Sequence, residues 1–257
     1  IINNVRLSLA KTKKQRVDML LVERGLVPTR TRAQSSIMAG LVFSGDRRIA
    51  KAGETLDLDA PLELRGKEHP WASRGGLKLD HALDTFGLEV AEATCLDIGA
   101  STGGFTDVLL SRGASKVFAV DVGKGQLDWK LRQDERVVVL EETNARYITA
   151  DHIPDAIDLI TCDVSFIGLE KVLPAGMDLC HAGSVLVALI KPQFQAGPDQ
   201  VSKGGIVRDP KIHDAVCEQV SQWLNAQPGW RVLGVTASPI TGAKGNREFL
   251  IAATKDA

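Results

Sequence analysis

From residue 73 onward the sequence alternates between short apolar runs and longer amphipathic stretches, and this alternation limits the possible folds more than any other feature. Short strands that alternate with helices predict a mostly parallel sheet with helices on both of its faces. The predicted strands are Thr94–Ile98, Lys116–Asp121, Val137–Leu140, Ile157–Asp163, Ser184–Ile190, Trp230–Ala237 and Glu248–Ala253. The clearest helical patterns are Phe105–Arg112, Ile167–Leu179 and Pro210–Asn225.

Only a loop containing Gly and Pro separates the last two predicted strands. A connection this short cannot make a parallel crossover, so the last strand, Glu248–Ala253, is expected to run antiparallel. A seven-stranded sheet whose last strand is reversed is typical of the class I methyltransferases, whereas a nicotinamide-binding Rossmann domain normally keeps its strands parallel. We therefore predict an α/β domain built on this Rossmann-like methyltransferase sheet.

A glycine-rich loop, residues 97–105, follows the first predicted strand and leads into a helix. Its glycines allow a sharp turn and the close approach of a ligand, but their spacing differs from the dinucleotide pattern G-x-G-x-x-G. Asp97 suits a ligand with a positively charged amino group, and Asp121 is placed to accept hydrogen bonds from ribose hydroxyls. These features favour S-adenosylmethionine, and the alternative is a glycine-rich turn without a cofactor. The candidate cofactor-binding residues are Asp97, Gly99, Ser101, Gly103, Gly104, Phe105, Asp121 and Asn144.

Two further polar residues, Asp163 and Lys191, end the fourth and fifth predicted strands. Ligands of open α/β sheets bind at this carboxyl edge. Because Lys191 follows the apolar run Val185–Ile190, we expect it to be partly buried and suited to act as a base. A strand-end lysine that merely extends to solvent is the alternative. The loop 192–209 is long enough to close over a substrate.

The charge is distributed unevenly along the chain. Residues 1–50 carry ten Lys or Arg and three Asp or Glu, a net charge of +7, whereas the remaining 207 residues carry 21 and 29, a net charge of −8. A basic unit joined to an acidic one is consistent with a module that binds a polyanion such as RNA. A solvated basic face without a partner explains the charge equally well. Arginine forks suit phosphates. The candidate RNA-binding residues are Arg16, Arg24, Arg30, Arg32, Arg47 and Arg48.

This basic segment has the pattern of a small α+β domain. One helix is predicted after Arg16, with Val17, Leu20 and Leu21 on its apolar face and Gly25 beyond its end. The spacing of Thr31 and Gln34 predicts a capping box for a second helix, whose apolar face is Ala33, Ile37 and Met38. Short strands follow at 41–43 and through Leu56, Leu58, Leu62 and Leu64.

Several classes of protein are disfavoured by the composition. The four cysteines lack a paired zinc-type spacing, and Cys95 and Cys162 lie in apolar runs, which indicates a reducing compartment and no structural metal. The longest aliphatic run, Val185–Ile190, is far shorter than the roughly 20 residues of a membrane-spanning helix. No apolar segment near the start of the sequence suits a signal peptide. We expect a cytoplasmic protein that binds neither membrane nor metal.

Several motifs together carry a family resemblance. The run Arg16 to Val27, with Thr31 to Gln34 and Ala39 to Val42, resembles the RNA-binding domain named after ribosomal protein S-four. From Ser73 onward the chain resembles the FtsJ-like ribose methyltransferases, and the two domains in this order resemble the TlyA family. The motifs on which this resemblance rests are residues 73–79 (SRGGLKL), 97–105, 163–166 (DVSF), 190–194 (IKPQF) and 245–249 (GNREF). The implied domains are a basic extension 1–15, the RNA-binding domain 16–64, a linker 65–73 and the methyltransferase domain 74–257.

The resemblance implies a Lys-Asp-Lys-Glu catalytic tetrad, which falls on Lys78, Asp163, Lys191 and Glu248. It also implies S-adenosylmethionine-dependent 2′-O-methylation of cytidine in ribosomal RNA, with ribosomal RNA or ribosomal subunits as partners. In this interpretation Lys191 lies between Asp163 and Glu248 and activates the ribose hydroxyl. Two alternatives stay open: a haemolysin or cytolysin, after the family's historical name, and an RNA-binding protein whose methyltransferase fold is inactive.

Overall fold

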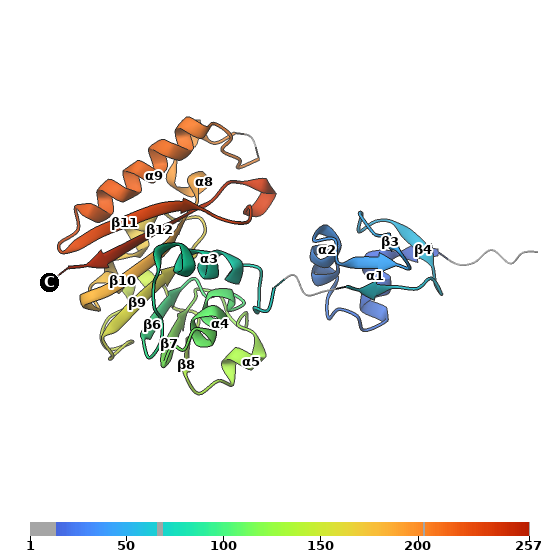
Figure 1. The fold of residues 1–257 in the computed structure, drawn as a ribbon, viewed down its shortest axis with the longest axis horizontal. Coiled ribbons are helices and arrows are strands. Elements are labelled where there is room, and N and C mark those ends of the chain that lie inside the picture. The colour runs from blue at the N-terminus through green and yellow to red at the C-terminus, as the bar shows by residue number, and fades with distance from the viewer. Residues whose placement is uncertain (1–13, 66–68, 203, 257) are drawn as a thin grey trace, which may run out of the picture. The chain divides into compact units, whose positions relative to one another are not determined.

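A computed structural model describes residues 14–65, 69–202 and 204–256. The chain divides into two compact units, residues 1–70 and 71–257. Lys11 and Lys13 of the expected basic extension lie outside the described residues, whereas Lys14 and Gln15 belong to a strand of the smaller unit. Figure 1 shows the elements of both units.

The smaller unit pairs two helices with short antiparallel strands. Its elements are β1 (Lys14–Arg16), α1 (Val17–Glu23), α2 (Arg30–Met38), β2 (Val42–Ser44), β3 (Arg47–Arg48), β4 (Thr55–Asp57) and β5 (Glu63–Leu64). Strand β1 pairs with β4, and β2 lies between β3 and β5. The buried core contains residues from both helices and from β2, including Val17, Leu21, Ile37 and Val42.

A buried carboxylate joins the two helices of this unit. Asp18 in α1 is fully buried and accepts hydrogen bonds from Arg16 at 2.9 and 3.0 Å, from Arg30 at 2.9 Å and from Gln34 at 3.2 Å. The hydrogen bond from Arg16 is the largest cause that lowers the pKa of Asp18 well below its usual range. The two arginines therefore support the fold of the unit as well as its positive charge.

Two details of helix α2 differ from the sequence-based prediction. The N-cap is Thr29, whose side chain accepts from the Arg32 backbone N–H, so the predicted capping box at Thr31 and Gln34 is wrong. Gln34 instead donates to Asp18 across the helix pair. Met38 was expected on the buried face but is 75% exposed, as the last residue of the helix.

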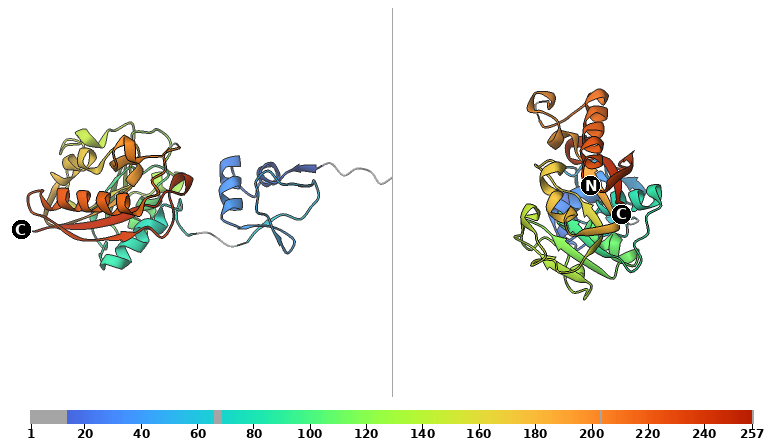
Figure 2. Two further views of the ribbon diagram at one scale, coloured as in Figure 1. Left: turned by 90° about the horizontal axis from the view of Figure 1, so that it is seen from above. Right: turned by 90° about the vertical axis from the view of Figure 1, so that its left-hand side faces the viewer.

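The larger unit is a seven-stranded sheet between two layers of helices (Figures 1 and 2). Its strands are β6 (Thr94–Ile98), β7 (Lys116–Val120), β8 (Val137–Leu140), β9 (Ile157–Cys162), β10 (Cys180–Ile190), β11 (Trp230–Ala237) and β12 (Phe249–Lys255). Their order is β11-β12-β10-β9-β6-β7-β8, and β12 runs antiparallel to both of its neighbours. All seven predicted strands and the reversal of the last one are confirmed.

The two faces of the sheet are covered by different helices, and successive strand residues alternate between them. On one face Cys95 packs with α3 (Gly76–Phe86), α4 (Gly104–Ser111) and the short helix α5 (Trp129–Arg132). On the other face Leu96 packs with α6 (Leu169–Val172), α7 (Pro174–Met177) and α9 (Pro210–Asn225). Apolar residues on both faces make each central strand a nearly continuous hydrophobic run.

One predicted helix is interrupted. The segment 167–179 forms α6 and α7 rather than a single helix, because Pro174 has no backbone N–H to continue the hydrogen-bond ladder and instead begins the second helix. Strand β10 also starts earlier than predicted, at Cys180. It still ends at Ile190, so Lys191 follows it directly, as expected.

Candidate active site

The polar residues predicted from the motifs gather at the carboxyl edge of the sheet. The chain runs outward from β6 to β7 and β8, then returns to place β9 on the other side of β6. This reversal of strand order opens a crevice between β6 and β9, where α/β sheets bind their ligands. A cavity of about 790 Å³ lies there, next to a smaller one of about 280 Å³. The two share Gly99, Ser101, Asp163 and Ser165 as lining residues.

Gly99 is the residue that lets the loop after β6 approach β9. Its φ angle is +85°, a conformation that side chains disfavour. A Cβ atom at this position would lie 2.7 Å from the backbone oxygen of Asp163. Glycine is therefore required here both by the turn and by the space.

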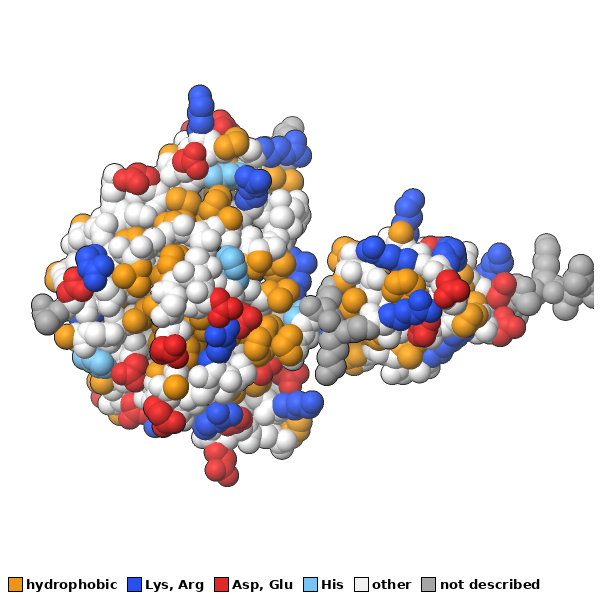
Figure 3. Space-filling view, viewed as in Figure 1, with side chains coloured by type: hydrophobic (Ala, Val, Ile, Leu, Met, Phe, Trp, Pro, Cys, Tyr) orange, Lys and Arg blue, Asp and Glu red, His pale blue; other side chains and the backbone are white. Residues whose placement is uncertain are grey.

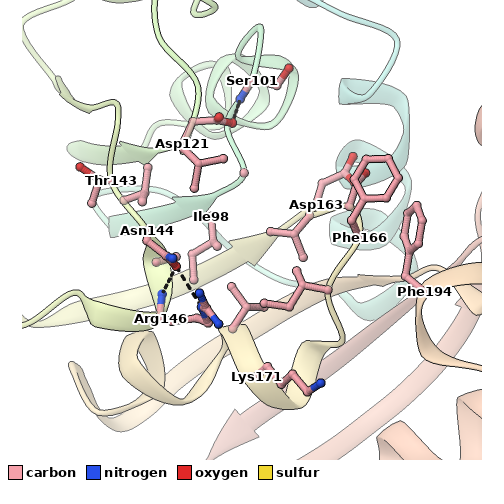
Figure 4. Close-up of a pocket in the computed structure, with 18 of the residues that line it drawn as sticks. Ile98, Ser101, Asp121, Thr143, Asn144, Arg146, Asp163, Phe166, Lys171 and Phe194 are labelled. Carbon is pink, nitrogen blue, oxygen red and sulfur yellow. Dashed lines mark hydrogen bonds between the residues drawn. The ribbon is translucent and has the colours of Figure 1, made fainter.

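The larger cavity holds three of the other predicted cofactor residues (Figure 4). Asp121 accepts hydrogen bonds from the backbone N–H groups of Ser101, at 2.8 Å, and Gly123, at 2.7 Å. Each of its oxygens keeps a second lone pair for a ligand. Asn144 lines the cavity after β8 and accepts from the Arg146 backbone N–H at 3.1 Å.

The remaining predicted cofactor residues lie around this loop in different roles. Gly104 and Phe105 line the smaller cavity. Gly103, with φ +93°, lines neither cavity; a Cβ there would collide with Leu131 at 2.2 Å, so it permits close packing under the loop.

Asp97 is fully buried beneath the loop and is not among the residues that line either cavity. Its carboxylate accepts hydrogen bonds from Thr106 at 2.7 Å and from Thr161 at 3.0 Å. Burial raises the pKa of Asp97 to about 6, against the opposing effect of these two hydrogen bonds. The structure thus gives Asp97 a supporting position, joining α4 to β9 under the site, rather than direct access to a ligand.

The four residues of the expected tetrad meet beside the smaller cavity, as a chain of alternating charges. Lys78 Nζ lies 2.7 Å from Glu248 Oε2 and 3.6 Å from Asp163 Oδ2. On the other side of Asp163, its Oδ1 lies 2.5 Å from Lys191 Nζ. Lys78, Asp163 and Lys191 line the cavity, and Glu248 is buried behind them.

The pairing inside this group corrects one expectation. Glu248 forms its ion pair with Lys78, so the prediction that Lys191 lies between Asp163 and Glu248 is wrong. The second contact of Lys191 is Ser165, whose Oγ accepts from Nζ at 3.0 Å. Ser165 belongs to the motif 163–166 but is not among the predicted site residues. The sequence feature that could have identified it is its position two residues after Asp163.

The position of Glu248 depends on a neighbouring glycine. A Cβ on Gly242 would lie 1.9 Å from Glu248 Oε1, so only glycine leaves room for the carboxylate. The same loop is held from the other side by Asn246, which accepts from the Val207 N–H at 3.1 Å and donates to the Gly205 oxygen at 2.8 Å. These contacts hold Val207 and Gly205 against the loop that contains Glu248 and leads into β12.

The smaller cavity is predominantly basic. Arg74, Lys78 and Lys191 line it together with one acidic residue, Asp163. Arg74 also donates to the backbone oxygen of Thr241. A cavity with this balance suits an acceptor that carries phosphate groups or that develops negative charge on an oxygen.

An aromatic pair stands at the edge of the larger cavity. Phe166 follows the motif serine with a φ angle of +66° and is 89% exposed. Its ring centroid lies 4.8 Å from that of Phe194, at an interplanar angle of 48° (Figure 4). An exposed, large apolar side chain held in a strained backbone conformation indicates a surface that contacts a ligand.

The arginines predicted to bind RNA divide into two groups. Arg16 and Arg30 hold Asp18, Arg24 donates to the backbone oxygens of Leu58 and Ala60, and Arg47 pairs with Glu54 at 2.5 Å. Arg32 and Arg48 form no ion pair within the described part of the chain. Figure 3 shows Lys and Arg side chains over the visible face of the smaller unit, interrupted by acidic ones.

Neither a membrane-spanning helix nor a metal site is present among the described residues. None of their helices is long and apolar enough to cross a bilayer. In the same residues, no group of three or more His, Cys, Asp or Glu side chains could hold a metal ion.

The strand order, the reversed last strand and the cavity at the β6–β9 crevice define a class I methyltransferase. The sequence matches the FtsJ-like methyltransferase family over residues 71–255, and the chain belongs to that family. Family and fold together imply S-adenosylmethionine as the methyl donor. The site fits this donor, because Gly99 leaves a free approach, Asp121 has spare lone pairs, and the larger cavity has the volume of a ligand pocket.

The similarity to known proteins extends across both units of the chain. The chain is 51% identical over 93% of its length to the "Putative rRNA methyltransferase YqxC" of Bacillus subtilis, covering 85% of that protein. It is 46% identical over 93% of its length to the 16S/23S rRNA (cytidine-2′-O)-methyltransferase TlyA of Mycobacterium tuberculosis, covering 89% of that protein. A solved structure, "Putative hemolysin from Streptococcus thermophilus", superposes with a TM-score of 0.75 at 45% identity, over 95% of this chain and 90% of the other.

Proposed function

We propose that this protein transfers a methyl group from S-adenosylmethionine to the 2′-hydroxyl of a cytidine in ribosomal RNA. The observation that carries the proposal is the Lys191–Asp163 pair, at 2.5 Å, in the wall of a basic cavity that adjoins a donor-sized one. The name of the tuberculosis relative supports cytidine and ribosomal RNA as the substrate class. From this substrate class we infer that the protein works in the cytoplasm.

In this proposal the bound donor supplies an electrophilic methyl group, and the residues of the chain prepare the acceptor oxygen. Lys191 takes the proton of the 2′-hydroxyl, and Asp163 holds the Nζ atom that receives it. Lys78, 3.6 Å from the other oxygen of Asp163, adds positive charge where the acceptor oxygen becomes negative. Glu248 fixes Lys78 from behind. Holding acceptor and donor in adjoining cavities aligns them for in-line transfer.

The surroundings of the tetrad support an RNA acceptor. Arg74 beside the tetrad suits a backbone phosphate. The exposed pair Phe166 and Phe194 offers a surface on which an unstacked base can lie, the usual mode of recognition of single RNA bases. The smaller unit, with Arg32 and Arg48 outside any described ion pair, contributes binding to the RNA backbone.

The two other functions considered have less support. For the haemolysin alternative, support comes from the name of a solved structure, which calls that protein a "Putative hemolysin". An inactive methyltransferase fold would have no need of the contacts that link Glu248, Lys78, Asp163 and Lys191. All of these residues except Glu248 line one cavity.

The test is methyl transfer from labelled S-adenosylmethionine to unmethylated small and large ribosomal subunits, offered separately. The wild-type protein should label RNA in at least one subunit. Lys191→Met should reduce the rate by at least about a hundredfold while donor affinity stays within twofold. Lys211→Met, an exposed lysine at the start of α9, is the matched control and should keep full activity. Full activity in Lys191→Met, or no label from the wild-type protein on either subunit, would contradict the proposal.

A further inference from the structure

Ser165 links the two halves of the active site. It is one of the four residues that line both cavities, and its Oγ lies 3.0 Å from Lys191 Nζ. Among the described residues, the other partner of that amine is Asp163 Oδ1, at 2.5 Å. The Lys191 side chain is only 10% exposed, so these two oxygens largely decide where its Nζ atom points.

The number of contacts matches the valence of a neutral amine. A lysine that acts as a base has two N–H groups and one lone pair. If Asp163 accepts one N–H and Ser165 the other, the lone pair is left facing the cavity that Lys191 lines. With Asp163 alone, the amine could turn about its Cε–Nζ bond and offer an N–H to the hydroxyl instead of the lone pair.

We propose that Ser165 is a positioning residue for methyl transfer, which aims the lone pair of Lys191 at the acceptor hydroxyl. This inference rests on the proposed function. The role requires a hydroxyl oxygen that accepts a hydrogen bond and nothing else from the side chain. Because Ser165 is exposed, its loss leaves no buried cavity, and threonine keeps the hydroxyl while adding one methyl group to an exposed side chain.

The test compares Ser165→Ala, which removes the acceptor, with Ser165→Thr, which retains it. Ser221→Ala is the matched control, because its hydroxyl bonds a backbone oxygen in α9 at 2.8 Å, remote from both cavities. The measurements are kcat and KM with RNA, together with the affinities for S-adenosylmethionine and for RNA determined by calorimetry without turnover.

Ser165→Ala should lower kcat about tenfold, with KM and both binding affinities within twofold of the wild-type values. Ser165→Thr should recover most of the lost kcat. The inference is overturned by an unchanged kcat in Ser165→Ala, by a loss of donor or RNA affinity that accounts for the slower rate, or by an equal loss in both variants. Failure of the wild-type protein to methylate ribose would instead overturn the proposed function itself, so the two failures are distinguishable.

Discussion

Gly99 and Asp163 meet at the ends of two adjacent parallel strands, where a Cβ on the glycine would lie 2.7 Å from the backbone oxygen of the aspartate. The two residues belong to different parts of the site, since Gly99 is in the donor loop and Asp163 is in the tetrad. Their contact means that the donor loop and the carboxylate that holds Lys191 cannot be displaced independently. In the proposed mechanism, backbone packing at the centre of the sheet therefore sets the distance between donor and acceptor.

Gly99→Ala should therefore impair both donor binding and transfer. The added methyl group must push β6 away from β9 or distort a left-handed turn, and we expect donor affinity to fall by at least about tenfold, which corresponds to roughly 1.4 kcal/mol. Gly183→Ala is the control, because Gly183 has a similar φ of +93° but nothing within 4 Å of the added atom. Calorimetric titration with S-adenosylmethionine measures the difference, and equal affinities in the two variants would refute the steric explanation.

The buried pair Lys78–Glu248 should behave as a unit in stability measurements. Their side chains are 9% and 3% exposed, so Lys78→Met leaves a carboxylate buried without its partner, at a cost of about 3–5 kcal/mol in the free energy of unfolding. The double variant Lys78→Met/Glu248→Gln removes both charges and should regain a large part of that loss. Urea denaturation of the two single variants and the double variant gives the coupling energy, and additive losses would show that the pair is not coupled.

The buried Asp97 makes the stability of the larger unit depend on pH. Its pKa of about 6 in the folded state lies above the unfolded value of 3.8, so the folded state binds an extra proton between these values. Stability should fall as the pH rises from about 4 to about 6, by roughly 3 kcal/mol from this group.

Asp97→Asn should remove that dependence. All four tryptophans lie at positions 71–257, so their fluorescence reports unfolding of the larger unit alone. The quantity to compare is the difference in unfolding free energy between wild type and variant at pH 4 and at pH 7. A difference that does not change with pH would contradict the raised pKa.

The smaller unit should respond to pH in the opposite direction. The pKa of Asp18 is lowered by its arginine partners, so its contribution to stability is present above the unfolded pKa and is lost as the pH falls through the folded value. Asp18→Asn should speed amide hydrogen exchange across α1 and α2 at neutral pH and leave exchange in the larger unit unchanged. Unaltered protection of α1 and α2 would show that the buried carboxylate does not hold the helices together.

RNA binding should depend on Arg32 and Arg48, which form no ion pair within the described part of the smaller unit. Arg32→Gln and Arg48→Gln should each weaken RNA binding and lower the slope of log affinity against log salt by about 0.7–0.9, without unfolding the unit. Arg65→Gln is a control on the same unit, because that guanidinium is already paired with Glu63 at 2.5 Å. An unchanged slope in both test variants would remove this unit's arginines from the RNA interface.

The sequence was sufficient for those features that depend on local pattern. Apolar runs located every strand of the larger sheet, and the short connection before Phe249 predicted the reversed strand. The four tetrad residues came from the family motifs, and the structure brings them together.

What could not be predicted depends on contacts between distant segments. Thr29 rather than Thr31 caps α2, and Gln34, which the predicted capping box would have used, donates to Asp18 in the other helix. Glu248 pairs with Lys78, 170 positions away, in a space that Gly242 leaves open for the carboxylate. The burial of Asp97 likewise follows from Thr106 and Thr161 lying on either side of it in the folded sheet.

The most direct test of the account is the chemical position of the transferred methyl group. RNA labelled by the wild-type protein would be hydrolysed in alkali, which cleaves at every nucleotide with a free 2′-hydroxyl. We expect the label in alkali-resistant dinucleotides whose first base is cytosine, and no such label with Lys191→Met. Label recovered in mononucleotides, with the methyl group on the base, would contradict the ribose mechanism assigned to the tetrad.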